Sequence, residues 1–239
     1  MLFRFGARIF VAGLGVPRDI IDKLHSHGVL VGSMCGKVRH AVNAVASGCD
    51  FVVAQGTEGG GHTGTVATMA LVPQVVDAVG DKVAVVAAGG LFDGRGLAAA
   101  LSLGADGVWI GTRFIATPEA WGVDGYKDVL VATPEDGTVI SRAYTGKTCR
   151  VVRNDWTNEF EKNPDQLQPF PQQAIASMQA GVNHLGSPPG TTVDLNREFL
   201  PAGQGVGAIE SIIPAGEIVR TMVREATETI ERLTSLRKS

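Results

Sequence analysis

The sequence predicts an α/β fold built on a parallel sheet, and three observations support this prediction. Five short runs rich in valine and alanine have the apolar character of buried strands. Segments with helical spacing separate these runs, and glycines follow most of the segments at the expected turns. Because strands that alternate with helices pair in parallel, we expect repeated strand–helix units in the first half of the chain.

The expected strands and helices alternate in order along the chain. The strands cover residues 7–12, 29–32, 51–54, 83–88 and 107–110, and each is apolar enough to be buried on both faces of a sheet. Helices are expected over residues 17–27, 37–47, 69–79 and 94–103. Pro17 suits a first helical turn, and the helix ends are marked by Gly28, Gly48, Gly80 and Gly104.

The pattern changes after Pro118. Residues 119–214 are richer in Pro, Asn, Gln and Trp, with short helices expected near 154–162 and 171–183 and a loop at 186–192. The final stretch, 215–236, is amphipathic and is expected to be a helix that packs back on the strand–helix half. The expected division is therefore 1–118, a mostly helical appended subdomain over 119–214, and a C-terminal helix within 215–239.

Composition argues against several classes of protein. The net charge is -3 and no long basic run is present, so neither nucleic acid nor a membrane surface is an expected partner. The three cysteines have no CxxC spacing, which indicates neither a disulfide framework nor a metal site. No apolar run reaches the roughly 20 residues of a membrane span, and no signal-peptide pattern is visible. A cytoplasmic location is expected, and the oligomeric state stays open, with a homo-oligomer among the options.

The most informative segment is VVAQGTEGGGHTG, residues 52–64, in which an apolar strand runs into five glycines. Glycines let the backbone approach a ligand closely, and a neutral imidazole at a strand end can remove a proton from carbon beside an electron-withdrawing group. His62 is therefore the candidate base. Gln55 either contacts a heterocycle or caps its strand, and Glu58 either orients His62 or is solvated, with the solvated alternative favoured.

Two further glycine turns predict a phosphate-binding cradle. AAGGLFDGRGL, residues 87–97, places Gly89 and Gly90 between a strand and a helix, and VWIGTRF, residues 108–114, repeats this arrangement one unit later. Exposed backbone N–H groups at such turns attract anions. Glycines that only make tight turns would give the same pattern at either position, but two such loops in succession favour the cradle.

The segments AQGTEGGGHTG, AAGGLFDG and WIGTRF, in this order and spacing, resemble the nitronate monooxygenase family, formerly called 2-nitropropane dioxygenases. TGKTCRVVRNDWT, PFPQQ and AGQGVGAIES, within residues 145–211, resemble the tail of that family, so the resemblance covers nearly the whole chain. It implies an FMN-dependent TIM-type (β/α)8 barrel. The implied reaction oxidises alkyl nitronates, or nitroalkanes, with O2 to a carbonyl compound and nitrite.

The resemblance also implies roles for individual residues. His62 falls on the base that deprotonates a neutral nitroalkane. The run 109–112 falls around the phosphate of FMN. All the positions that match the FMN site are Gln55, Gly60, Gly89, Gly90, Trp109, Ile110, Gly111, Thr112, Gln204 and Gly205.

The chain departs from the family pattern in two ways. The family begins with strands that carry an APM-type loop and an asparagine at the flavin, and neither is present here. Five strands are counted where a closed barrel has eight, so we expect an incomplete barrel of about the last five βα units. A fragment, a late start codon or completion by a partner would each account for this, and a truncated family sequence is favoured. In addition, GGGH stands where the family usually has AGGH.

Three alternatives remain at this point. The flavin-dependent enoyl-acyl-carrier-protein reductases share the barrel and the Gly-Gly-His loop. A catalytically silent remnant, or a module that keeps only the phosphate cradle, is a hypothesis of another class. A doubly wound Rossmann-type sheet is disfavoured because the first βα turn, residues 13–17, lacks the GxGxxG order.

Overall fold

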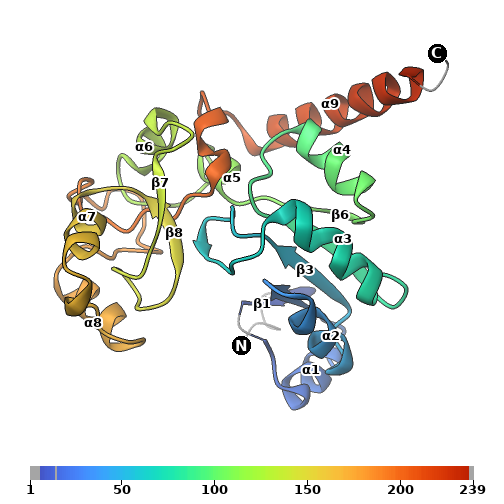
Figure 1. The fold of residues 1–239 in the computed structure, drawn as a ribbon, viewed down its shortest axis with the longest axis horizontal. Coiled ribbons are helices and arrows are strands. Elements are labelled where there is room, and N and C mark those ends of the chain that lie inside the picture. The colour runs from blue at the N-terminus through green and yellow to red at the C-terminus, as the bar shows by residue number, and fades with distance from the viewer. Residues whose placement is uncertain (1–5, 14, 237–239) are drawn as a thin grey trace. The chain divides into compact units, whose positions relative to one another are not determined.

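The computed structural model describes residues 6–13 and 15–236, and the chain divides into two compact units (Figure 1). The first unit consists of Met1–Thr57, Gly64–Gly89 and Arg95–Trp109. The second consists of Glu58–Thr63, Gly90–Gly94 and Ile110–Ser239. Two short loops that follow strands of the first unit therefore belong to the second unit. Each unit is described by itself.

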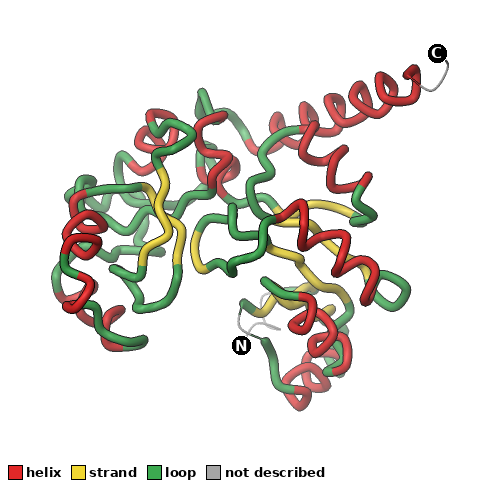
Figure 2. Tube along the Cα trace, viewed as in Figure 1, coloured by secondary structure: helices red, strands yellow, loops and turns green. Residues whose placement is uncertain are grey.

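The first unit contains a five-stranded sheet in which every neighbouring pair is parallel. Figure 2 draws the strands in yellow. The order of the sheet is β1-β2-β3-β5-β6, and the strands are β1 (Ile9–Ala12), β2 (Leu30–Cys35), β3 (Phe51–Gln55), β5 (Ala84–Ala88) and β6 (Gly107–Trp109). All five strands expected from the sequence are present. In the register of the sheet Gln55 pairs with Ala88, and Ala88 pairs with Trp109, so these strand ends lie along one edge.

Four helices alternate with these strands as expected: α1 (Arg18–His25), α2 (Val38–Ala46), α3 (Thr68–Val79) and α4 (Gly94–Ser102). Apolar residues at helical spacing are buried, including Ile21 and Leu24 on α1 and Leu71, Val72 and Val75 on α3. Pro17 precedes the first turn of α1 as its N-cap, one position earlier than expected.

At two places in this sheet, an aspartate that precedes one strand forms hydrogen bonds with the neighbouring strand. Asp50, ahead of β3, accepts a hydrogen bond from the N–H of Val31 at 2.7 Å, and its own N–H donates to Val31 O at 2.8 Å. Asp106, ahead of β6, does the same with Val85 at 2.8 Å and 2.8 Å. The repeated Gly-Cys-Asp and Gly-Ala-Asp sequences thus fix the register of the sheet at two places.

Burial on both faces holds for the central strand but not for the edges. Val52, Val53 and Ala54 of β3 are 0% exposed, whereas Ile9 on β1 is 58% exposed and Trp109 on β6 is 44% exposed. The physical reason is that β1 and β6 each have a single neighbour in this sheet. The apolar composition of the two edge strands alone does not reveal this difference.

The second unit contains a three-stranded antiparallel sheet that the sequence did not predict. Its order is β4-β8-β7, with β4 (Gly61–His62), β8 (Cys149–Val152) and β7 (Thr138–Ser141). The helices of this unit are α5 (Thr112–Ile115), α6 (Tyr126–Ala132), α7 (Asp155–Lys162), α8 (Gln172–Gln179) and α9 (Ala215–Ser235), with 3-10 turns η2 (Pro164–Gln166) and η3 (Gln204–Ala208). The helices expected near 154–162, 171–183 and 215–236 are therefore present.

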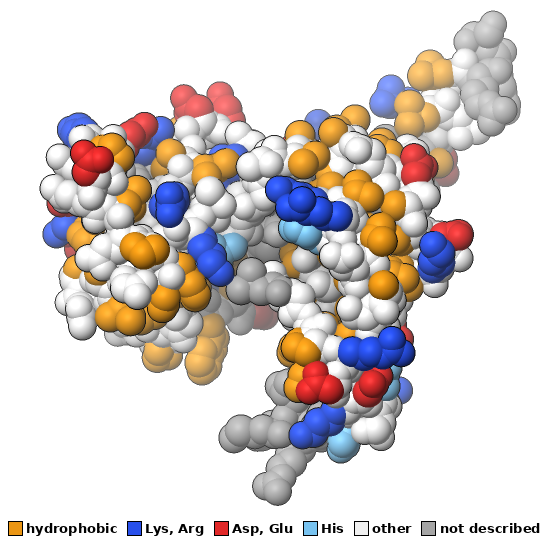
Figure 3. Space-filling model, turned by 60° about the horizontal axis from the view of Figure 1, so that its bottom comes forward, with side chains coloured by type: hydrophobic (Ala, Val, Ile, Leu, Met, Phe, Trp, Pro, Cys, Tyr) orange, Lys and Arg blue, Asp and Glu red, His pale blue; other side chains and the backbone are white. Residues whose placement is uncertain are grey.

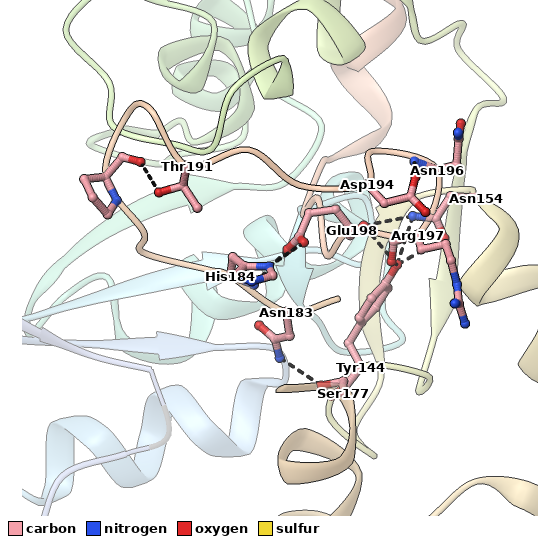
Figure 4. Close-up of polar contacts among 11 residues, drawn as sticks. Tyr144, Asn154, Ser177, Asn183, His184, Thr191, Asp194, Asn196, Arg197 and Glu198 are labelled. Atoms are coloured by element: carbon pink, nitrogen blue, oxygen red, sulfur yellow. Dashed lines mark hydrogen bonds and ion pairs between the residues drawn. The ribbon is translucent and has the colours of Figure 1, made fainter. Parts of the chain in front are cut away.

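A buried tyrosine organises the core beside β8. The Tyr144 ring stacks on Phe199, and its hydroxyl lies 2.8 Å from Arg197 O and 2.9 Å from Glu198 O (Figure 4). Asn154 donates to the same hydroxyl at 2.9 Å and also caps α7. The Glu198 carboxylate is 1% exposed and is compensated by the N–H and Nδ1 of His184, each at 2.8 Å. The hydrogen bonds of Tyr144 join the segment after β7 to Asn154 and to residues 197–198.

Helix α9 buries Ile218, Met222 and Ala226, and Glu225 accepts a hydrogen bond from the Gly94 N–H at 3.0 Å. Its other apolar residues are exposed, including Val219, Val223, Ile230 and Leu233. Hydrophobic side chains are visible on the molecular surface in Figure 3. That α9 packs on the strand–helix half stays a prediction.

Among the described residues, no helix combines the length and the apolar character required to cross a membrane. The same part of the chain contains no group of three or more His, Cys, Asp or Glu side chains placed to hold a metal ion.

Candidate functional site

Four glycine-bearing segments of the second unit contact one another, through backbone atoms and through the Thr112 hydroxyl. Gln204 donates its N–H to Glu58 O at 2.9 Å, and Gly203 donates its N–H to the Thr112 hydroxyl at 2.9 Å. A Cβ added at Gly60 would lie 2.7 Å from Gly203 N, closer than real Cβ atoms come to a backbone. The glycines in these segments are therefore needed for the backbones to meet.

This meeting brings together five residues that the sequence singled out. A Cβ on Gly205 would lie 3.2 Å from the carbonyl oxygen of Gly90, so these two glycines are neighbours as well. The five residues, from four distant parts of the sequence, are Gly60, Gly90, Thr112, Gln204 and Gly205.

Backbone N–H groups in this cluster fit an anion. Those of Gly90, Gly111 and Thr112 donate no hydrogen bond to any residue in the described ranges. Gly111 has open space on the side where a Cβ would stand, with no atom within 4 Å. Gly90 has a φ of 71°, which L side chains rarely adopt. Free amides beside open space are what the phosphate of a cofactor such as FMN requires.

Three expected cofactor residues belong to the first unit, at the carboxyl ends of its strands. Gln55 ends β3 and is half-buried, and Trp109 ends β6 with 44% of its surface exposed. Gly89 follows β5 with a φ of 105°, and a Cβ there would lie 2.8 Å from Thr68 Oγ1, which donates to Gly89 O. Packing against Thr68 thus accounts for a glycine at position 89. Ile110 is half-buried and begins the last segment of the second unit.

The structure gives His62 a defined partner. His62 lies on β4 and pairs with Cys149 on β8. Its Nε2 is 2.9 Å from the hydroxyl of Thr145, a buried residue that also accepts the Lys147 N–H at 3.3 Å. A tautomer with hydrogen on Nε2 donates to Thr145 and leaves the Nδ1 lone pair for a substrate proton.

The surroundings of His62 favour its neutral form. Desolvation lowers the pKa of His62 below its ordinary value of 6.5, and the positive charge of Lys147 lowers this pKa further. The residue as a whole is still exposed, so a substrate can reach the ring. A neutral and accessible imidazole is the form that accepts a proton at pH 7.

The sequence favoured a solvated Glu58, but the structure shows a different environment. Glu58 is half-buried, and its charge acts on Arg150 of β8, which is 6% exposed. Burial lowers the pKa of Arg150, and Glu58 opposes that shift. The carboxylate therefore compensates a buried cation of the antiparallel sheet.

Sequence reasoning missed the turn that follows Tyr144. Thr145 contacts His62, and Lys147 acts on it electrostatically and lies over the ring of Phe170, 4.1 Å from its centroid. The signal was present in TGKTC and PFPQQ, which the sequence linked to the family tail without giving their residues a role.

Comparisons with known proteins assign the chain to a family. The sequence pattern described as nitronate monooxygenase matches residues 2–225. This chain belongs to the nitronate monooxygenase family. A nitronate monooxygenase of Neurospora crassa is 35% identical over 92% of the chain and 60% of the relative. A dehydrogenase of an indene-carboxyl-CoA from Rhodococcus jostii is 44% identical over 67% of the chain and 45% of the relative.

Two solved structures share the fold over nearly the whole chain. FabK from Thermotoga maritima has a TM-score of 0.85 and 32% identity, covering 98% of this chain and 73% of that one. Nitroalkane oxidase from Streptomyces ansochromogenes has a TM-score of 0.81 and 29% identity, and the match covers 97% of this chain and 67% of that one. The chain spans less than two thirds of the length of the curated relatives named above. The chain has an α/β fold with a parallel sheet.

Proposed function

We propose that this chain carries the FMN-binding and proton-abstracting part of an enzyme that oxidises alkyl nitronates with O2 to a carbonyl compound and nitrite. Membership of the nitronate monooxygenase family and the likeness to nitroalkane oxidase support this proposal. The observation that carries it is His62, a neutral imidazole in a glycine loop with one ring nitrogen held by Thr145. The parallel sheet is inferred to be part of a TIM-type (β/α)8 barrel.

Each group of residues has a role in this proposal. The amides of Gly90, Gly111 and Thr112 hold the FMN phosphate, with Trp109 and Ile110 beside them. Gln55 binds the edge of the heterocycle, and the packed backbones of Gly60, Gln204 and Gly205 shape the site. FMN, when bound, supplies the redox chemistry. His62 takes a proton from the carbon of a neutral nitroalkane at Nδ1.

A substitution at His62 tests the base. His62→Asn is expected to lower kcat/KM for a neutral nitroalkane by about 10²–10⁴-fold, because general-base catalysis typically contributes that much. Turnover of the pre-formed nitronate, which needs no proton removal, should fall far less. His40→Asn, an exposed histidine on α2, is the matched control. Unchanged nitroalkane turnover in His62→Asn with FMN still bound would falsify the base assignment.

A visible spectrum of the purified chain separates an enzyme from a silent remnant. Absorption of oxidised flavin that co-purifies, or that is retained after FMN is added and the excess removed, is expected. A colourless protein that does not retain added FMN would favour the silent alternative.

A second candidate is oxidoreduction of an acyl thioester. The observation that favours it is the 44% identity with the carboxyl-CoA dehydrogenase, and the enoyl-acyl-carrier-protein reductases belong to the same chemical class. Anaerobic addition of NADH or of a nitronate to the flavin-loaded protein distinguishes the two. Loss of flavin colour with the nitronate supports the first function, and loss with NADH alone supports the second.

A further inference from the structure

Lys147 is placed by its own turn and by a neighbouring segment. It lies two residues after Thr145, and its N–H donates to the Thr145 hydroxyl that contacts His62. Gly146, with a φ of 79°, allows this turn to approach residues 168–170, because a Cβ there would lie 2.6 Å from Phe170 N. The Arg142 guanidinium donates to Gly146 O at 2.9 Å and closes the turn from the other side.

The ammonium group of Lys147 also contacts an aromatic ring. Its Nζ lies over the Phe170 ring, 4.1 Å from the centroid, a cation–π contact that restrains a long flexible side chain. Phe170 is in turn fixed by the segment around it, where Gln173 accepts the Gln168 N–H at 2.9 Å and donates to Ala143 O at 2.6 Å. Because the lysine is half-buried, its charge is less screened than that of a fully solvated lysine.

Lys147 has no carboxylate partner in the part of the chain that the structure describes. The ammonium group of Lys147 is therefore a half-buried cation close in the chain to Thr145, the contact of the candidate base, and it is available to bind an anionic ligand. After desolvation, which is the larger cause, the charge of Lys147 also lowers the pKa of His62.

We propose that Lys147, steadied by Phe170, binds the negatively charged oxygens of an anionic substrate beside His62 and so determines the selectivity of the site for anions. This inference rests on the proposed function, because the anion it concerns is the nitronate. An ammonium has three donors, and a nitronate carries its charge on two oxygens, so charge-assisted hydrogen bonds are available. The same charge stabilises the nitronate that forms when His62 deprotonates a neutral nitroalkane.

Binding and turnover of two substrates test this inference. Lys147→Gln is expected to raise KM for the anion propyl-2-nitronate about tenfold, which corresponds to about 1.4 kcal/mol. KM for neutral 2-nitropropane should change less than about twofold, because no charge is bound in that ground state. Lys147→Arg should keep most of the nitronate affinity. Lys162→Gln, an exposed lysine at the end of α7, is the matched control and should change neither value.

A measurement without turnover separates this inference from the proposed function. The imidazole signal of His62, assigned by its loss in His62→Asn, reports both binding of propyl-2-nitronate and the pKa of the ring. Lys147→Gln should weaken that binding about tenfold and raise the pKa. If the wild-type chain binds the nitronate but turns over neither substrate, the proposed function fails and the inference stands.

The inference is overturned if Lys147→Gln binds the nitronate as tightly as the wild type, or if it loses affinity for both substrates equally. It is also overturned if the His62 signal of the wild type does not respond to the nitronate, since the anion then binds elsewhere or not at all.

Discussion

At the scale of single residues, the local sequence identified His62 but not the groups that act on it. A histidine among glycines at a strand end is visible in a local pattern. Thr145 is 83 positions away and meets His62 because β4 pairs with β8. Lys147 comes with the same turn. The sequence could therefore single out His62 as a candidate base, whereas its contact with Thr145 and the shift of its pKa depend on long-range pairing that no local pattern contains.

The direction of the His62 pKa shift predicts a pH profile. Because burial first and Lys147 second lower this pKa below 6.5, kcat/KM for a neutral nitroalkane should rise along an acid limb with its midpoint below 6.5 and then level off. Turnover of a nitronate should lack this limb. Lys147→Gln should move the midpoint upward, since a repelling cation is removed. A midpoint above 6.5 in the wild type would contradict the assignment.

The lowered pKa of His62 also predicts how the stability of the fold depends on pH. A depressed folded-state pKa means that the unfolded chain binds the proton more readily, so the contribution of His62 is fully present above 6.5 and is lost as the pH falls through the folded value. Urea unfolding of the wild type and His62→Asn on both sides of this window gives the comparison. The wild type should lose more stability on acidification than the variant does.

At the scale of elements, the strand–helix half was predictable and the antiparallel sheet was not. Runs such as 51–54 and 83–88 are apolar enough to be recognised, and glycines mark the ends of the helices between them. β4 has two residues, and β7 and β8 have four each, too few for a clear alternating pattern. Their pairing also joins residues 61–62 to residues 149–150. Because its strands are short and pair with distant segments, this sheet could not be predicted from local sequence patterns.

The same substitution is expected to have effects of different size on stability at two glycines of the candidate site. Gly60→Ala forces a Cβ to within 2.7 Å of the backbone at Ala202 and Gly203, so the free energy of unfolding should fall by about 1–3 kcal/mol. Gly111→Ala meets no atom within 4 Å and should change it by less than about 0.5 kcal/mol. Urea denaturation measures both variants.

Gly111→Ala, although it should leave stability nearly unchanged, is expected to weaken the binding of FMN. The added methyl group of Gly111→Ala occupies the open space assigned to the phosphate, so FMN affinity should fall about tenfold or more in a fluorescence titration. A stable Gly111→Ala variant with unchanged FMN affinity would place the phosphate elsewhere.

At the scale of the whole molecule, local motifs identify the family, whereas the grouping of segments into compact units depends on contacts between distant residues. The family assignment was predictable because its motifs are local, and the family match confirms it over residues 2–225. The loops 58–63 and 90–94 are grouped with the second unit because they contact segments far along the chain, and no local pattern contains those contacts. The three-part division expected from the sequence stays a prediction.

The phosphate cradle predicts how the whole chain responds to two related flavins. A ligand that binds the folded state alone stabilises it by about 2.7 kcal/mol at a hundredfold excess over Kd. For a chain of this size, that is a rise in Tm of about 5–10 °C. Riboflavin has the same ring without the phosphate, so at equal concentration it should give a much smaller rise, and added salt should narrow the gap by screening the charge. Gly111→Ala should abolish the advantage of FMN over riboflavin. Equal shifts for the two flavins in the wild type would mean that the ring alone is bound and that the amides of Gly90, Gly111 and Thr112 hold no phosphate.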